Sequence, residues 1–184
     1  MPAPYRWREA QIAQEVEAVA GTAETLVAAD LFIAHDITLT NGVAVSPDGR
    51  TLYLADSIPR TIFAYDLDPE TGAITGKRIF ATTEDRPGVP DGATVDSEGH
   101  VWSAQFDAGL VVRYAPDGCV VREIPFPVTR VTSCVLGGPA LTTLYVTSAS
   151  FRLSDEERRA QPLAGAVFAV EVDVPGVPEA RYAG

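Results

Sequence analysis

Short segments that alternate apolar and polar residues fill the chain from Asn41 onward, with turn-forming residues between them. The first group contains "GVAVS", "TLYLAD", "TIFAYDLD" and "KRIFA", with the turns "PDGR" and "PETG". Alternation with a period of two is typical of β-strands that bury one face. The pattern therefore predicts four short strands in about forty residues, a spacing usual for all-β folds.

The same pattern restarts at Asp91 and, more loosely, near Thr132. The second group reads "GATVD", "VWSAQ", "GLVVRYA" and "CVVREI", and the third reads "SCVLG", "TTLYVTSA", "GAVFAVEV" and "EARYAG". A repeat of about 40–50 residues with four strands per unit is the signature of a β-propeller blade. We therefore expect an all-β fold of about three four-stranded blades. Closed propellers have roughly four to eight blades, so this is part of a ring.

Aromatic residues recur at equivalent places in the repeats. Tyr53, Trp102 and Tyr145 share one place on the second strand, and Tyr65 and Tyr114 share another on the third. Large aromatic side chains at fixed positions of a repeat are most simply explained by packing between units. We expect all five to be core residues and not ligand-binding residues.

The first forty residues do not follow the repeat. "REAQIAQEVEAVAG" has its apolar residues on one face of a helix, and the segment after it is irregular or strand-like. The expected organisation is an atypical leader with a short helix over residues 1–40, followed by a partial propeller over residues 41–184.

Composition narrows the function classes. The formal net charge is −11, which argues against nucleic acid and against an anionic membrane surface, because both need a basic patch. The start of the chain lacks a signal peptide, and no apolar run approaches the length of a membrane span. We therefore expect a cytoplasmic protein. Cys119 and Cys134 form neither a disulfide framework nor a metal-binding spacing.

The triplet Pro-Asp-Gly occurs three times, at residues 47–49, 90–92 and 116–118. The first and third lie between strands of one blade and predict tight turns. Asp91 differs because it precedes the first strand of a blade, as Asn41 does; Thr132 or Ser133 is the third counterpart. First strands line the channel of a propeller, so these side chains should converge. Their oxygens suit Ca²⁺, Mg²⁺ or Mn²⁺ and can serve Zn²⁺, although the spacing alone also fits ordinary turns.

Four segments carry a resemblance to a known family. They are "TNGVAVSPDGRTLYLADS", "VPDGATVDSEGHVWSAQFDAGLVVRYAPDG", "TSCVLGG" with "LYVTSA", and "LSDEERRAQPLAGAVFAV" with "ARYAG". From Thr40 to Gly184 the chain resembles the C-terminal half of the SMP-30/gluconolactonase/LRE family. The resemblance implies a six-bladed propeller with a divalent cation in the channel that hydrolyses sugar lactones. It also implies that Asn41 and Asp91 are metal ligands and that Asp91 is the general base.

The family's other ligand motifs, a Glu in a "GEGP"-like stretch among them, belong to blades without a counterpart here. Two hypotheses follow: a metal-dependent sugar-lactone hydrolase, or a non-catalytic half-propeller that serves as a binding or assembly module or is a truncated remnant. A homodimer that completes a six-blade ring would cover the open blade faces.

Two further features of the sequence give local predictions. The segment "SFRLSDEERRAQPLAG" predicts a short inserted helix, capped by Ser154 with Glu157 and ended by Pro162. From this loop Arg152 could reach a substrate. Asp96, Glu98 and His100 fall in a turn, where we expect a solvent-facing histidine.

Overall fold

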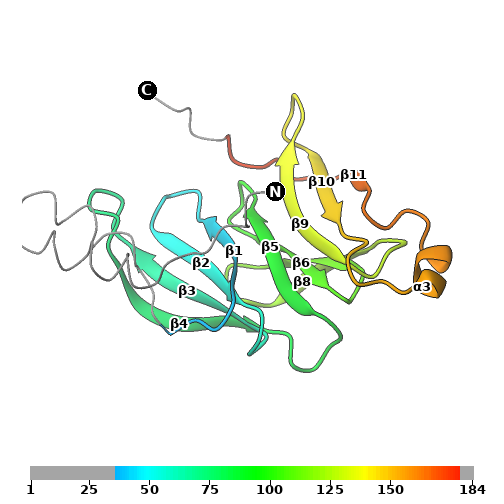
Figure 1. Cartoon of the computed structure of the whole chain (residues 1–184). Coiled ribbons are helices and arrows are strands. Elements are labelled where there is room, and N and C mark those ends of the chain that lie inside the picture. Colours follow the sequence, from blue (N-terminus) through cyan, green and yellow to red (C-terminus); the bar gives the residue numbers. More distant parts are fainter. Residues whose placement is uncertain (1–35, 179–184) are drawn as a thin grey trace, which may run out of the picture. The chain divides into compact units, whose positions relative to one another are not determined.

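The structure is a computed structural model, and it describes residues 36–178, all of which except Asp36 belong to the compact unit Ile37–Gly184. The strands in this range are all antiparallel and form three sheets (Figure 1). The predicted all-β propeller class is confirmed. The leader predicted for residues 1–40, with its helix, lies outside the described residues except at its last positions, so the proposed domain boundary stays a prediction.

Blade 1 is the sheet β1-β2-β3-β4, in sequence order. Its strands are β1 (Thr40–Val45), β2 (Thr51–Asp56), β3 (Thr61–Leu67) and β4 (Ile74–Thr82). The two middle strands carry mostly buried residues, while β4, the outer strand, is largely exposed. The first group of alternating segments therefore forms a blade, as its pattern predicts.

Blade 2 repeats this order as β5-β6-β7-β8. Its strands are β5 (Val89–Val95), β6 (Val101–Phe106), β7 (Leu110–Tyr114) and β8 (Val120–Pro125). Five consecutive residues of β6 are buried, so both faces of this strand are covered.

Blade 3 contains β9 (Val131–Gly137), β10 (Thr143–Ser148) and β11 (Val167–Glu171), in the order β11-β10-β9. The fourth strand that the sequence predicts, "EARYAG", falls at residues 179–184, outside the described part of the chain.

Two apolar cores join the blades. The first contains residues of blades 1 and 2, including Ile62, Val101 and Tyr114, and the second contains residues of blades 2 and 3, including Trp102 and Leu144. The inner strands follow one another, since β1 contacts β5 and β5 contacts β9 (Figure 1). Blade 2 therefore has a neighbour on each face.

Of the five repeated aromatic residues, four are buried: Tyr53, Tyr65, Trp102 and Tyr114. For these the predicted role in packing is confirmed. Tyr145 is 38% exposed, so the same prediction was wrong for this residue in the described structure. The reason is geometric: Tyr145 lies on the face of blade 3 that no described strand covers.

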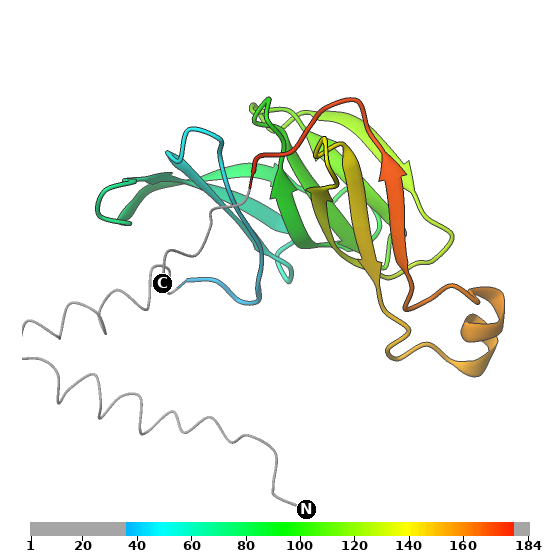
Figure 2. The ribbon, with the colours of Figure 1, turned by 90° about the horizontal axis from the view of Figure 1, so that it is seen from above.

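The insertion after β10 forms the helix α3 (Asp155–Ala160), which stands apart from the sheets in Figure 2. Ser154 accepts a hydrogen bond from the backbone N–H of Glu157, and the Glu157 carboxylate accepts one from the N–H of Ser154. The predicted capping box is therefore confirmed, and the helix ends at Ala160, with Gln161 as its C-cap just before Pro162. Among the described residues, no helix is long and apolar enough to cross a membrane.

Candidate functional site

The three Pro-Asp-Gly triplets have two different structures. Those at residues 47–49 and 116–118 are turns, in which Gly49 and Gly118 have positive φ and donate to the carbonyls of Ser46 and Ala115. Pro90-Asp91-Gly92 instead lies inside β5. The structure thus separates Asp91 from the turn aspartates, as the sequence suggested.

A β-bulge marks the beginning of each inner strand. The register of β1 shifts between Asn41 and Ala44, and that of β5 shifts between Pro90 and Ala93. In β9 the shift falls at Thr132. Bulges often re-aim side chains next to active sites. The three positions that the sequence singled out therefore share the same local irregularity.

Glycines bring these inner strands into backbone contact. A Cβ on Gly42 would lie 2.4 Å from the carbonyl oxygen of Asp91, and a Cβ on Gly92 would lie 2.2 Å from Oγ of Ser133. Both distances are far shorter than any real contact of a Cβ. Only glycine fits at either position, so β1 lies against β5 at Asp91 and β5 lies against β9 at Ser133.

Asn41 is oriented by a hydrogen-bond chain that crosses from blade 1 to blade 2. Its Nδ2 donates to Oγ of Ser57 over 2.9 Å, and Ser57 Oγ donates to the carbonyl of Pro90 over 2.7 Å. The Pro90 peptide immediately precedes Asp91. One serine hydroxyl therefore connects the two candidate metal ligands, and the sequence analysis missed it because a serine after a strand carries no metal or nucleophile signal.

Asp91 is a partly buried carboxyl group, and burial raises its pKa from 3.8 to about 6. A hydrogen bond from the backbone N–H of Gly92 lowers the pKa of Asp91, but by less than burial raises it. Within residues 36–178 no arginine, lysine or histidine forms an ion pair with this carboxylate. A desolvated carboxylate without a counter-charge favours a cation or a proton.

The oxygen donors of Asn41 and Asp91 fit a hard divalent cation. Asn41 offers a carbonyl oxygen, since its amide nitrogen is bound to Ser57, and Asp91 offers a carboxylate. Thr132 contributes less, because its hydroxyl is hydrogen-bonded to that of Thr147 at 2.8 Å. Two protein ligands would leave most of a Ca²⁺ shell of roughly six to eight oxygens to water, substrate or other residues.

A second acidic group, Asp96 with Glu98 and His100, has ligand atoms within 4.8 Å of one another. Asp96 is fully buried, and its carboxylate accepts hydrogen bonds from the N–H groups of Glu98 and His100, from Trp102 Nε1 and from Arg113 Nε. Arg113 supplies the counter-charge, so this group is a structural centre and not a cation site.

His100 differs from its expected position. Its side chain is 18% exposed, with Nδ1 lying 3.7 Å from Asp96 and 3.8 Å from Glu98. The expectation of a solvent-facing histidine was wrong, because the turn folds back on the buried carboxylate of Asp96.

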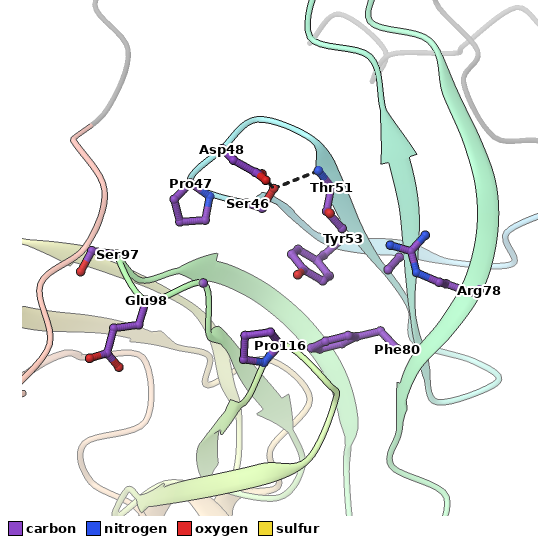
Figure 3. Close-up of a pocket in the computed structure, with 12 residues that line it drawn as sticks. Ser46, Pro47, Asp48, Thr51, Tyr53, Arg78, Phe80, Ser97, Glu98 and Pro116 are labelled. Carbon is purple, nitrogen blue, oxygen red and sulfur yellow. Dashed lines mark hydrogen bonds between the residues drawn. The ribbon is translucent and has the colours of Figure 1, made fainter.

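A hollow of about 420 Å³ lies between blades 1 and 2, beside the turns that contain Asp48 and Glu98 (Figure 3). Tyr53 and Phe80 line it, and its charged groups are already engaged: Asp48 in its own turn, Arg78 with Asp66, and Glu98 with Arg113. We assign no site to this hollow.

The fold and these residues define a class: part of a β-propeller with oxygen donors at the start of its inner strands. The family profile "SMP-30/Gluconolactonase/LRE-like region" matches residues 23–150. The chain belongs to the SMP-30/gluconolactonase/LRE-like family.

Three relatives illustrate this membership. The chain is 41% identical to a 6-deoxy-6-sulfogluconolactonase of Pseudomonas putida, over 83% of this chain and 52% of that protein. It is 37% identical to a pentonolactonase of Haloferax volcanii, over 79% and 51%. The crystal structure of a calcium-binding protein, regucalcin, from Agrobacterium tumefaciens matches with a TM-score of 0.75 and 34% identity, over 78% of this chain and 49% of that one. The chain spans about half the length of these relatives.

Proposed function

We propose that this chain carries part of the active site of a metal-dependent sugar lactonase. The observation that supports this most directly is the pairing of Asn41 and Asp91 on neighbouring bulged strands, linked through Ser57 and Pro90. Relatives that cover most of the chain are named as lactonases of sugar acids. A hydroxylated cyclic ester is therefore the proposed substrate class.

Asn41 and Asp91 would hold a divalent cation (Ca²⁺, Zn²⁺, Mn²⁺ or Mg²⁺) through a carbonyl and a carboxylate oxygen. When bound, such a cation polarises an ester carbonyl and stabilises the negative charge that develops on its oxygen. A neighbour described as a calcium-binding protein supports a divalent cation.

Asp91 would also be the general base. In the absence of a cation, burial raises the pKa of this carboxyl group to about 6, so the carboxylate is mostly ionised at pH 7. A carboxylate within reach of an attacking water can accept its proton. One oxygen of the carboxylate can face the cation while the other accepts the proton. Hydrolysis then breaks the ring ester and yields the open hydroxy acid.

The test is proton release from glucono-δ-lactone in a pH-stat, with Ca²⁺, Mn²⁺, Zn²⁺ or EDTA. Asp91→Asn is the informative variant. Asp117→Asn is its matched control, because Asp117 is the aspartate of another Pro-Asp-Gly triplet, one that forms an exposed turn. We expect metal-dependent hydrolysis that Asp91→Asn abolishes and Asp117→Asn retains. A rate equal to the enzyme-free blank with every metal, from folded protein, would contradict the proposal.

A second candidate is a non-catalytic binding or assembly module, and one observation favours it. The open face of blade 3 carries the aligned row Val135, Tyr145 and Ala169, one residue from each strand. Val135, Tyr145 and Val167 are exposed on this blade. Apolar rows of this kind mark protein contacts.

Such a contact would join two copies of this chain into a homodimer that completes a six-blade ring. The molar mass in solution, measured by light scattering, tests this: a dimer supports it and a monomer at high concentration contradicts it. A homodimer whose lactone hydrolysis equals the blank would favour the assembly role. A cytoplasmic location stays a prediction.

A further inference from the structure

We propose that Ser57 is a positioning residue that fixes which end of the Asn41 amide is offered to the cation. This inference rests on the proposed cation site at Asn41 and Asp91. It concerns a side chain that touches neither cation nor substrate and acts through its neighbours.

Ser57 is held rigidly at the end of β2. It is 2% exposed, its backbone N–H donates to the carbonyl of Leu39, and its own carbonyl accepts from Arg60. A residue anchored on both backbone groups and enclosed by protein has little freedom to move its hydroxyl. Its direction is consequently set before any ligand binds.

The number of protons on the hydroxyl decides the orientation of Asn41. A serine has one hydroxyl proton, and Ser57 gives it to the carbonyl of Pro90 in a buried hydrogen bond. The hydroxyl can then only accept from Asn41, and only the Nδ2 end of the amide can donate. The reverse orientation would bring two oxygens together or break the bond to Pro90. Oδ1, the metal-ligand end, is therefore turned away from Ser57.

The same hydroxyl also holds the strand that carries Asp91. Pro90 is the residue before Asp91, and it lies beside the bulge of β5. Because proline has no N–H, its carbonyl is its one backbone group that can form a hydrogen bond. Ser57 thus sets the rotation of one candidate ligand and the backbone position of the other.

The experiment is a double-mutant cycle in Mn²⁺ affinity, with free Mn²⁺ measured by electron paramagnetic resonance in the absence of substrate. Ser57→Ala is compared with wild type, and the same change is made in the Asn41→Asp protein. A carboxylate offers an oxygen in either orientation, so Asn41→Asp removes the need for orientation. We expect Ser57→Ala to weaken Mn²⁺ binding about tenfold with asparagine at position 41 and roughly twofold with aspartate there.

Ser103→Ala is the matched control. Ser103 is also a buried serine, but its hydroxyl donates to the carbonyl of Ala104, accepts from Nε2 of Gln105 and does not contact Asn41. The Ser103→Ala protein should bind Mn²⁺ with an affinity within about twofold of wild type. If the loss of any buried hydroxyl weakened Mn²⁺ binding, Ser57→Ala and Ser103→Ala would lower the Mn²⁺ affinity equally.

The outcomes separate the two proposals. Equal weakening by Ser57→Ala in both backgrounds, or none in either, overturns the proposal that Ser57 orients the Asn41 amide, while an Asp91-dependent Mn²⁺ site stands. Wild type and Asp91→Asn that bind Mn²⁺ equally, or not at all, overturn the cation site itself and the role of Ser57 with it. A loss confined to the asparagine background supports the inference.

Discussion

Blades 2 and 3 are built from the same repeat but differ in what covers them. Trp102 in blade 2 and Tyr145 in blade 3 hold equivalent places on the second strand, yet Trp102 is fully buried and Tyr145 is 38% exposed. Trp102 packs in the core shared with blade 3, whereas no described strand lies over Tyr145. Burial at this position is therefore a property of the neighbouring blade and not of the strand that carries the residue.

This difference gives the blades different energetic roles. A large aromatic side chain enclosed between two sheets contributes its full apolar area and its packing contacts. The equivalent side chain on an open face contributes only part of that area. Stability should consequently concentrate at the two interfaces of blade 2.

The largest effect is expected for Trp102→Ala, which would lower the free energy of unfolding by about 3–5 kcal/mol, because it empties a fully enclosed site. It also removes the donor Nε1 from Asp96. Urea denaturation followed by circular dichroism measures the change. If Trp102→Ala lowered the free energy of unfolding by no more than Tyr145→Ala does, the contrast between blades 2 and 3 would be contradicted.

Asp96→Asn should have the next largest effect, a loss of about 3 kcal/mol, because it breaks the ion pair between the fully buried Asp96 and the partly buried Arg113 and leaves Arg113 with Glu98 alone. Asp173→Asn is the control. It breaks the exposed pair with Arg122 and should change the free energy of unfolding by less than about 1 kcal/mol. Equal costs for the two would show that Asp96 is not the structural centre of blade 2.

Asp91→Asn should stabilise the metal-free protein at pH 7.5 by about 1 kcal/mol, a figure reduced for the partial exposure of the group. The folded protein keeps this proton up to a pKa of about 6, while the unfolded chain releases it near 3.8. The carboxylate therefore lowers stability as the pH rises through this window and has no effect below it. Melting temperatures in EDTA at pH 3.5 and 7.5 check the sign. A variant less stable than wild type at pH 7.5 would contradict it.

The smallest effect is expected for Tyr145→Ser in a monomer, less than about 1 kcal/mol, because much of the side chain is already in water. If a second copy covers blade 3, this substitution should cause a larger loss of stability, and the loss should depend on protein concentration. Thermal unfolding at two concentrations a hundredfold apart separates these cases.

The strands and turns were predictable because they depend on local pattern. Alternation located the blades, and the capping box of α3 depends on residues three positions apart. The burial of Asp96 and the bridge through Ser57 were not predictable. Both depend on residues brought together from separate strands, Arg113 in one case and Pro90 in the other. The repeat placed Asn41 and Asp91 immediately before the inner strands, whereas the structure has them inside β1 and β5. Their roles as ligands and base remain proposals.

The contact between Gly42 and the backbone of Asp91 has a consequence for how this site can vary. At this point the closest approach of β1 to β5 is set by the main chain of Asp91, which leaves no room for a side chain at position 42. Any side chain at position 42 would therefore force the two strands apart. The positions least tolerant of change should then include Gly42 and Gly92, which contribute no side chain at all.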